Sequence, residues 1–452
     1  MRREINQYLL EWKDRSDRKP LIIRGARQVG KTYTVESFAR QYFKNLVKIN
    51  LEEKPELRKL FDKNDTKLII NEISILLEAD IDYGATLLFL DEIQTSANAI
   101  RVLRYFYEQM PDLHVIAAGS LLDLTLNEIQ YSMPVGRVEF CYMYPLNFRE
   151  FLEANAQPKL AGYIRNYDFN TTFSPVMHDK IIQYLRLYFF IGGMPEAVKT
   201  YITTNKLSDV ERVHNSIITS LIYDFAKYGN RKQQENMIAV FKYAANNTGK
   251  KIKYVHIDKE TRSTFLKEAF FKLEMSRVLY LVRHTNVASA PVNDLLNNKV
   301  FKPVFLDIGL ANHIGNIQLI EIDNLITHNE GMLAEQFVGQ ELISGNKPFT
   351  DGKLFYWMRE KKNANAEIDY LLQHENKLYP VEVKAGKTGT LKSLHQYLHE
   401  KKMKTGIRFN LDKPSIGDFS ISMQNIGANT SLNYKLISLP LYLASVFSGF
   451  LE

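Results

Sequence analysis

The chain has 452 residues, more than a single hydrophobic core usually serves, so we expect two to four domains. Hydrophobic residues make up 45%, charged residues 24% and aromatic residues 12%, which argues against long disordered arms. The formal net charge of +7 permits nucleic-acid binding, but mild charge for solubility explains it at least as well. The single cysteine, Cys141, excludes a disulfide within the chain and a cysteine-rich zinc site.

The sequence contains no apolar run that approaches the length of a membrane-spanning helix. Its N-terminus (Met1, Arg2, Arg3, Glu4) is charged, unlike the apolar core of a signal peptide. We therefore expect no membrane partner and a cytoplasmic location.

Strands and helices are predicted to alternate along residues 1–155. Apolar strands are expected at 21–24, 46–50, 86–90 and 114–118, with helices at 31–42 and 97–109. The run from Thr86 to Leu90 is apolar after its first residue, which is typical of a strand covered on both faces. This alternation predicts an α/β nucleotide-binding domain with a parallel sheet and right-handed crossovers.

Three further segments are predicted beyond residue 155. Residues 156–230 form a helical segment, interrupted by Gly192-Gly193-Met194-Pro195. Residues 231–325 place two helices before two strands, an order that favours a winged helix; the helices are expected at 234–245 and 263–273, the strands at 278–282 and 300–306. Residues 326–452 combine a helix near 334–343 with strands at 354–358, 367–372 and 378–383.

The first strand leads into a phosphate-binding motif. The residues Gly25-Ala26-Arg27-Gln28-Val29-Gly30-Lys31-Thr32 match G-x-x-x-x-G-K-[ST] at every fixed position, between a strand and a helix. Its glycines let backbone N–H groups wrap a phosphate at a helix N-terminus. Lys31 is expected to reach the β and γ phosphates of ATP, and the Thr32 hydroxyl to ligate Mg²⁺.

Two adjacent carboxylates, Asp91 and Glu92, end the buried strand that contains Leu87–Leu90. We expect Asp91 to hold Mg²⁺ beside the phosphate-binding loop of the neighbouring strand, and Glu92 to orient or deprotonate the attacking water. The alternative, that one of them only caps the next helix, leaves the second carboxylate unexplained.

Two further polar residues are candidates for contact with the γ-phosphate. Ser120 follows the strand at 114–118 and is expected near the two carboxylates. Arg137, in Pro134-Val135-Gly136-Arg137, is a candidate γ-phosphate sensor acting in cis or from a neighbouring subunit of a homo-oligomer. An ordinary ion-paired surface arginine is an equal alternative.

A second set of carboxylates is predicted near the C-terminus. If a hairpin turns at Glu375-Asn376, Asp369 lies opposite Glu382, and Lys384 joins their face. Carboxylates opposed in this way need a positive charge between them, which a divalent metal supplies, and the lysine is then placed to position or activate water. Glu335 could add a third carboxylate. The alternative is an ordinary cross-strand ion pair between Lys384 and Glu367.

Basic residues gather inside the predicted winged helix: Lys250, Lys251, Lys253, Lys259, Arg262 and Lys267. They could neutralise DNA phosphates. The alternative is an accessory segment whose charges are simply solvated.

The motifs together resemble a bacterial and archaeal family of AAA+ ATPases with an uncharacterised C-terminal domain. The resemblance extends from the phosphate-binding loop through Leu90-Asp91-Glu92-Ile93-Gln94, Ala118-Gly119-Ser120-Leu121-Leu122, Pro134-Val135-Gly136-Arg137, Tyr144-Pro145-Leu146, Gly192-Gly193-Met194-Pro195-Glu196 and Phe305-Leu306-Asp307-Ile308-Gly309-Leu310. It implies an AAA+ core, a helical lid, a winged-helix segment and a C-terminal α/β domain similar to PD-(D/E)XK nucleases.

Two functional hypotheses follow from these observations. In the first, Mg²⁺-dependent ATP hydrolysis controls a DNA-associated, nuclease-like C-terminal domain. In the second, the protein is a nucleotide-switched signalling or scaffold NTPase, and its C-terminal domain binds a partner without cutting it.

Overall fold

The computed structural model describes residues 1–120, 122, 133–170, 172–287, 292, 296–316, 330–359, 366–386, 390–425 and 428–451. The chain forms two compact units. The N-terminal unit comprises Met1–Pro145, Phe271–Val278 and Lys347–Asp351, and the C-terminal unit comprises Leu146–Phe270, Leu279–Asn346 and Gly352–Glu452. None of the helices in the described ranges is long and apolar enough to cross a lipid bilayer.

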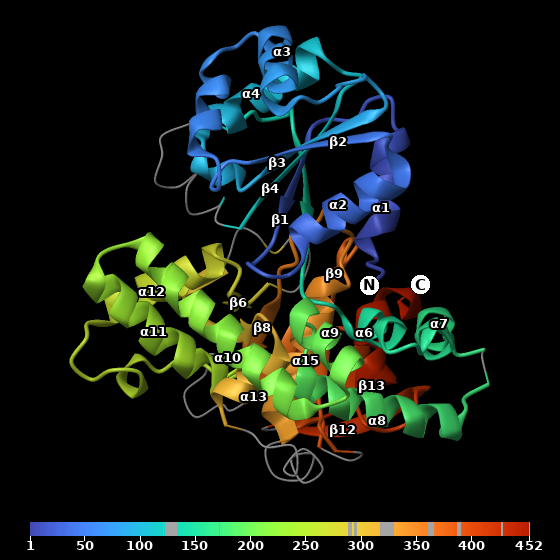
Figure 1. The fold of residues 1–452 in the computed structure, drawn as a ribbon. Coiled ribbons are helices and arrows are strands. Elements are labelled where there is room, and N and C mark those ends of the chain that lie inside the picture. Colours follow the sequence, from blue (N-terminus) through green and yellow to red (C-terminus); the bar gives the residue numbers. More distant parts are fainter. Residues whose placement is uncertain are drawn as a thin grey trace. The chain divides into compact units, whose positions relative to one another are not determined.

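The N-terminal unit is built on a five-stranded parallel sheet in the order β2-β3-β4-β1-β5 (Figure 1). Its strands are β1 (Leu21–Arg24), β2 (Asn45–Asn50), β3 (Thr86–Asp91), β4 (His114–Gly119) and β5 (Glu139–Tyr142). Its helices are α1 (Ile5–Asp14), α2 (Lys31–Tyr42), α3 (Thr66–Leu77) and α4 (Ala97–Gln109), with short 3-10 segments η1 (Pro55–Asp62) and η2 (Ile93–Thr95). The predicted α/β class with a parallel sheet is confirmed.

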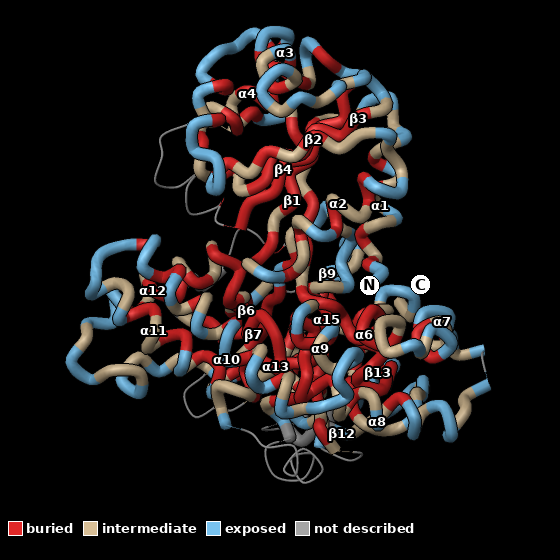
Figure 2. The backbone as a smooth tube through the Cα atoms, viewed as in Figure 1, coloured by how far each residue is buried: buried red, intermediate tan, exposed pale blue. Residues whose placement is uncertain are grey.

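Burial explains why these segments become strands and helices. Every residue of β3 and β4 is buried, as expected for apolar runs covered on both faces (Figure 2). The helices bury one face only: α4 turns Val102, Leu103 and Phe106 to the core. Its first turn is capped by Ser96, whose side chain accepts a hydrogen bond from the Ala99 N–H at 3.2 Å.

The parallel register brings the carboxyl ends of β1, β3 and β4 to one edge of the sheet. Ile116 of β4 pairs with Leu21 of β1 on one side and with Phe89 of β3 on the other. The sequence analysis placed Asp91 on the strand next to the phosphate-binding loop, and this is wrong in detail because β4 lies between β1 and β3. Ser120, directly after β4, is therefore central at this edge.

The C-terminal unit begins with helices. They are α6 (Phe148–Ala154), α7 (Pro158–Asn166), α8 (Pro175–Ile191), α9 (Pro195–Thr204), α10 (Leu207–Asp224), η3 (Phe225–Tyr228), α11 (Arg231–Ala245), η4 (Tyr254–His256), α12 (Ser263–Met275, whose last turn belongs to the N-terminal unit), α13 (Ile308–Ile314), α15 (Glu330–Ser344), α16 (Lys392–Lys401) and η6 (Leu441–Phe450). The break between α8 and α9 falls at Gly192–Met194, where the sequence predicts an interruption.

A mixed eight-stranded sheet completes this unit, in the order β12-β13-β11-β10-β9-β8-β6-β7. Its strands are β6 (Leu279–Thr285), β7 (Leu296–Phe305), β8 (Phe355–Met358), β9 (Glu367–His374), β10 (Lys377–Val383), β11 (Thr405–Asn410), β12 (Ser415–Asn425) and β13 (Ala428–Pro440).

This sheet differs from the predicted division into segments. The boundary expected at residue 325 lies outside the described residues, yet strands from both sides of it share one sheet, since β6 pairs with β8 in parallel. The pair β6–β7 is therefore the edge of the large sheet and not a separate wing. The order of two helices followed by two strands is as predicted, but the two strands continue into the eight-stranded sheet.

Candidate functional site

The phosphate-binding loop is formed around its own lysine. Lys31 is buried, and its Nζ donates hydrogen bonds to the carbonyl oxygens of Gly25 at 3.0 Å and Ala26 at 2.8 Å. Burial lowers the pKa of Lys31 to about 8, while the charges of Glu92 and Asp91 oppose this decrease. A triphosphate would offer this amine anionic partners in place of two neutral carbonyls.

Two glycines allow the loop its shape. Gly30 caps α2 with a φ of 91°, a left-handed conformation that side chains rarely adopt. Gly25 lies so close to the carbonyl oxygen of Met143 that a Cβ there would collide with it. The motif glycines are thus required by a positive φ in one case and by a close backbone approach in the other.

The loop and the end of β3 are joined by a hydrogen bond. The Thr32 hydroxyl donates to Asp91 Oδ2 at 2.8 Å. Burial raises the pKa of Asp91, an effect that the Thr32 hydrogen bond partly offsets. Lys48 Nζ on β2 lies 3.8 Å from the same carboxylate oxygen and also pairs with Glu36 at 2.8 Å. Thr32 and Asp91 are thus brought together as predicted for a shared metal.

Glu92 has an unusual backbone at this edge. Its φ of 52° and ψ of 44° lie in the left-handed region, which costs a non-glycine residue on the order of 1–3 kcal/mol. Its carboxylate accepts a hydrogen bond from Gln94 Nε2 at 2.6 Å. The Gln94 side chain in turn lies against Gly119, where any Cβ would meet its Oε1. The side chain of Glu92 is therefore oriented by a partner that depends on Gly119.

Ser120 is 3% exposed, and its hydroxyl has no hydrogen-bond partner among the residues that the structure describes. A buried hydroxyl without a partner is costly, so such a group is a candidate contact for a bound ligand. Its position directly after β4 makes it available to a ligand held between the loop and Asp91.

Arg137 is not at this edge. It precedes β5, whose Glu139 pairs with Leu21 at the start of β1, whereas the phosphate-binding loop follows the end of β1. Arg137 Nε instead donates to Glu108 Oε1 at 2.8 Å, and Arg104 shares that oxygen. A γ-phosphate contact in cis is therefore wrong, since the parallel register places the arginine at the opposite edge. The ion-paired alternative describes what this residue does within its own chain.

Sequence reasoning missed Arg3 as a support of the loop. Its guanidinium donates to the carbonyl oxygen of Val29 at 3.0 Å and to that of Tyr144 at 2.6 Å. The arginine thus ties the loop to the segment after β5, and it is 7% exposed. This role is visible only in the tertiary structure, because no sequence motif connects Arg3 with the phosphate-binding loop.

The arrangement fits Mg²⁺ and a nucleoside triphosphate. The donor set at the edge is oxygen-rich, as Mg²⁺ requires: Thr32 is hydrogen-bonded to Asp91, and the Ser120 hydroxyl has no partner in the part of the chain that the structure describes. Lys31 is a buried cation held by neutral carbonyls, for which phosphate oxygens are the stronger partners.

The C-terminal carboxylates occupy a second site, in the other unit. The hairpin pairs His374 with Lys377 and continues to Tyr370 opposite Val381, the register that the sequence predicts. Asp369 and Glu382 are the next residues on the two strands. Asp369 Oδ2 accepts a hydrogen bond from the Val383 N–H at 2.7 Å.

The cation among these carboxylates is an amine that sequence analysis did not identify. Lys302, on β7 and 1% exposed, places its Nζ 2.9 Å from Glu367, 3.6 Å from Glu335 and 3.9 Å from Asp369. Burial lowers the pKa of Lys302, but the three carboxylates together raise it above its usual value. Lys302 supplies the positive charge that the sequence analysis assigned to a metal.

Lys384 pairs with Glu382 at 2.6 Å, its neighbour two residues along β10. The alternative considered for Lys384, a cross-strand pair with Glu367, is not formed among the described residues, because Glu367 pairs with Lys302 and with Lys251, the latter at 2.7 Å. Burial and the Asp369 charge raise the pKa of Glu382 to about 7. The pKa of Glu335 is raised to about 8 by the same two causes.

The described residues contain no group of three or more Asp, Glu, His or Cys side chains arranged to hold a metal ion. Glu335, Asp369 and Glu382 thus lie in one cluster, as predicted, but as placed around Lys302 they do not fit a metal. One oxygen each of Glu335 and Glu382 is buried and has no hydrogen-bond partner among the described residues.

The basic segment is divided in its contacts. Lys251 forms an ion pair with Glu367, and Lys267 is half-buried. We therefore do not expect either lysine to be available for a DNA phosphate. The remaining cations are exposed: Lys250, Lys253, Lys259 and Arg262.

Replacing Arg3 with Ala tests the support of the loop. We expect the free energy of unfolding to fall by about 1–3 kcal/mol, because the Val29 and Tyr144 carbonyls lose their charged donor. ATP affinity should also fall, although Arg3 belongs to no phosphate-binding motif. Thermal unfolding and nucleotide titration measure the two effects. Arg2→Ala, at an exposed neighbour, is the control, and equal behaviour of the two variants would contradict the prediction.

Replacing Lys302 with Met tests the carboxylate cluster. We expect a loss of about 3–5 kcal/mol in stability near neutral pH, because three partly buried carboxylates lose their shared cation. Adding Glu335→Gln should restore part of the loss. Denaturant unfolding measures both, with exposed Lys253→Met as control. A Lys302→Met variant as stable as the parent would show that the amine does not hold the cluster.

Family models match three successive parts of the chain. Residues 17–152 match an AAA domain, residues 182–321 a domain of unknown function (DUF8612), and residues 330–424 another (DUF4143). Comparison with curated proteins finds no match.

Among solved structures, three similar ones have low TM-scores. PCH-2 of C. elegans is 12% identical, with 46% of this chain covering 64% of that one and a TM-score of 0.29. The ORC2 protein of Aeropyrum pernix, in ADPNP and ADP complexes, is 12% identical over 71% of this chain and 92% of its own, with a TM-score of 0.33. The A. pernix ORC1 protein in complex with DNA is 9% identical over 70% of this chain and 92% of its own, with a TM-score of 0.29.

The first matched model coincides with the parallel sheet, the phosphate-binding loop and the Asp91–Glu92 pair. The C-terminal models name no activity. The N-terminal unit of this protein is accordingly a nucleotide-binding domain of the AAA ATPase type.

Proposed function

We propose that the protein hydrolyses ATP with Mg²⁺ at the edge formed by the phosphate-binding loop, Asp91 and Glu92. The Thr32–Asp91 hydrogen bond carries this proposal, because it joins the loop to the strand end where a metal and the γ-phosphate would meet. Thr32 and Asp91 would hold Mg²⁺, which neutralises phosphate charge when bound. Lys31 would leave the Gly25 and Ala26 carbonyls for the phosphates.

Glu92 is the proposed base. Its carboxylate is half-buried and oriented by Gln94, and its left-handed backbone is the strain expected at a reacting position. Asp91 is less suited to this role, because its two oxygens already accept hydrogen bonds from the Thr32 hydroxyl and the Glu92 N–H. The adjacent carboxylates thus have different tasks.

Two substitutions test ATP hydrolysis. Lys31→Ala should abolish measurable ATP affinity, because the β and γ phosphates lose their cation. Glu92→Gln should keep affinity and lower the rate of phosphate release about 10²–10⁴-fold, the usual contribution of a general base. Calorimetry and a phosphate-release assay measure the two quantities.

Glu78→Gln is the matched control, since Glu78 is also a left-handed glutamate but is exposed at the end of α3. An ATP affinity of Lys31→Ala equal to that of the parent would contradict the proposed nucleotide site. Equal release rates for Glu92→Gln and the parent would leave binding without catalysis by Glu92.

We further propose that any contact between Arg137 and the γ-phosphate comes from a neighbouring subunit. The arginine is half-buried, and its pairing with Glu108 is a surface ion pair, which a phosphate can displace at low cost. Its place at the opposite edge of the sheet is compatible with reaching another protomer's nucleotide in a homo-oligomer.

A second proposal concerns the C-terminal unit, which we infer associates with DNA under the control of the nucleotide state. The exposed cations of the basic segment support it, and Lys251 of that segment joins the carboxylate cluster through Glu367. Lys302 within the cluster favours binding without cutting over a nuclease. No step of DNA cleavage follows from the residues as placed.

DNA binding is tested with the paired substitution of Lys253 and Lys259 by Ala. If both contact phosphates, the slope of log affinity against log salt should fall by about 2. Exposed Lys159 and Lys413, changed to Ala, provide the control with equal charge. Fluorescence anisotropy with a DNA duplex measures the slope.

The same protein, incubated with DNA and Mg²⁺, should leave the duplex intact. Cutting that disappears in Asp369→Ala and Glu382→Ala, with ATP hydrolysis retained, would instead establish the nuclease. Absence of any DNA affinity would favour a scaffold whose partner is not DNA.

A further inference from the structure

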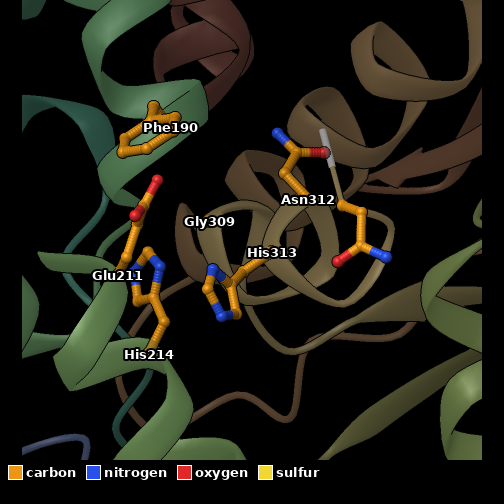
Figure 3. Close-up of a pocket in the computed structure, with 7 residues that line it drawn as sticks. Phe190, Glu211, His214, Gly309, Asn312 and His313 are labelled. Carbon is orange, nitrogen blue, oxygen red and sulfur yellow. The ribbon is translucent and has the colours of Figure 1, made fainter. Parts of the chain in front are cut away.

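A cavity of about 300 Å³ lies in the C-terminal unit, apart from the carboxylate cluster. Its lining comes from the last turn of α8 and from α10 and α13 (Figure 3): Phe190, Glu211, His214, Gly309, Asn312, His313 and the following Asn316. A volume of this size is at the lower end for small-molecule sites. Neither proposed function uses these residues.

The floor of the cavity is fixed by hydrogen bonds to the end of α8. His214 Nε2 lies 2.9 Å from the Ile191 carbonyl oxygen, and Asn312 Nδ2 donates to that of Phe189 at 2.6 Å. Both side chains are almost fully buried, at 1% and 2% exposure. Their orientation is set before any ligand arrives, as a binding site requires.

The start of α13 is held equally firmly. Asp307, fully buried, accepts hydrogen bonds from the Gly193 N–H at 2.6 Å and the Leu310 N–H at 3.1 Å. Gly309 packs so closely on Ile191 and Gly192 that a Cβ would collide with their backbone. The two glycine-containing motifs noted in the sequence thus assemble the wall of this cavity.

The lining offers hydrogen-bond acceptors beside the amide N–H groups of Asn312 and Asn316. Because a carbonyl oxygen only accepts, His214 carries its proton on Nε2 and presents Nδ1 as a lone pair. Burial lowers the pKa of His214 to about 4 and also lowers that of His313, so both imidazoles are neutral at pH 7. Asn312 donates one N–H to α8, and its amide also carries a second N–H and a carbonyl oxygen.

Glu211 is then the charged side chain of the lining. It is exposed at the mouth, and among the described parts of the chain it forms no ion pair. Figure 3 shows its carboxylate pointing toward the ring of Phe190, with the two imidazoles beside it; their ring centroids are 5.4 Å apart. Glu211, His214 and His313 do not form a metal site, since no such group within the described residues can hold an ion.

We propose that this cavity binds a small free organic cation that carries nitrogen donors, of the amine or guanidinium class. A carboxylate facing an aromatic ring attracts a cation from two sides, through an ion pair and a cation–π contact. The buried acceptors of His214 and Asn312 receive the N–H groups of such a ligand. Anions are disfavoured, because nothing in the lining is positively charged at neutral pH.

Calorimetry on the full chain tests this site with agmatine as the probe. We expect saturable binding, weakened about 10–100-fold by Glu211→Gln, the range for one charge-assisted hydrogen bond. Glu196→Gln on α9, an exposed carboxylate of the same unit outside the cavity, should bind as the parent does. His313→Ala is a second variant that should weaken binding, and unchanged thermal unfolding shows that each variant is folded.

Three outcomes would overturn the proposal. They are the absence of saturable agmatine binding, equal affinity of Glu211→Gln and the parent, and equal binding of glutarate, an anion of similar length. Acetyl-arginine amide tests whether the cation belongs to a partner protein. If it binds more tightly than agmatine, the cavity would instead accept an arginine side chain of a partner, and the proposal of a free ligand would be wrong.

Discussion

The parallel alignment of β1, β3 and β4 is the constraint on which the nucleotide site depends. Parallel strands end at a common edge, so a loop after one and carboxylates after another meet without any long-range motif. The Thr32–Asp91 hydrogen bond is the direct sign of this meeting. The same constraint removes Arg137 from its own chain's phosphates, since whatever precedes a parallel strand lies at the other edge.

Much of the fold could be predicted because burial leaves a plain pattern. The apolar runs of β3 and β4 and the capped periodicity of α4 each identify an element within a residue or two. Strand order could not be read in this way, and so β4 was not expected between β1 and β3. The edge position of β6 and β7 in the large sheet was missed for the same reason, as pairing partners are far apart in sequence.

The sites divide along similar lines. A motif with fixed spacing predicted Lys31 and Thr32, the end of a buried apolar strand predicted Asp91, and the hairpin register predicted Asp369 beside Glu382. Arg3 and Lys302 were not predictable, because each reaches its partners across more than twenty residues and resembles any other basic residue in sequence. Lys302 shows what one such residue changes: its charge lies among carboxylates for which the sequence predicts a metal ion.

The bonds of Lys31 to its own loop set the terms on which a phosphate can replace them. The amine donates to the carbonyl oxygens of Gly25 and Ala26, and a charged phosphate oxygen is a stronger acceptor than either. An exchange of partners returns two backbone carbonyls to the solvent, which offsets part of the free energy gained with the phosphate. A lysine that already has backbone partners is therefore expected to bind an anion less tightly than an amine without them.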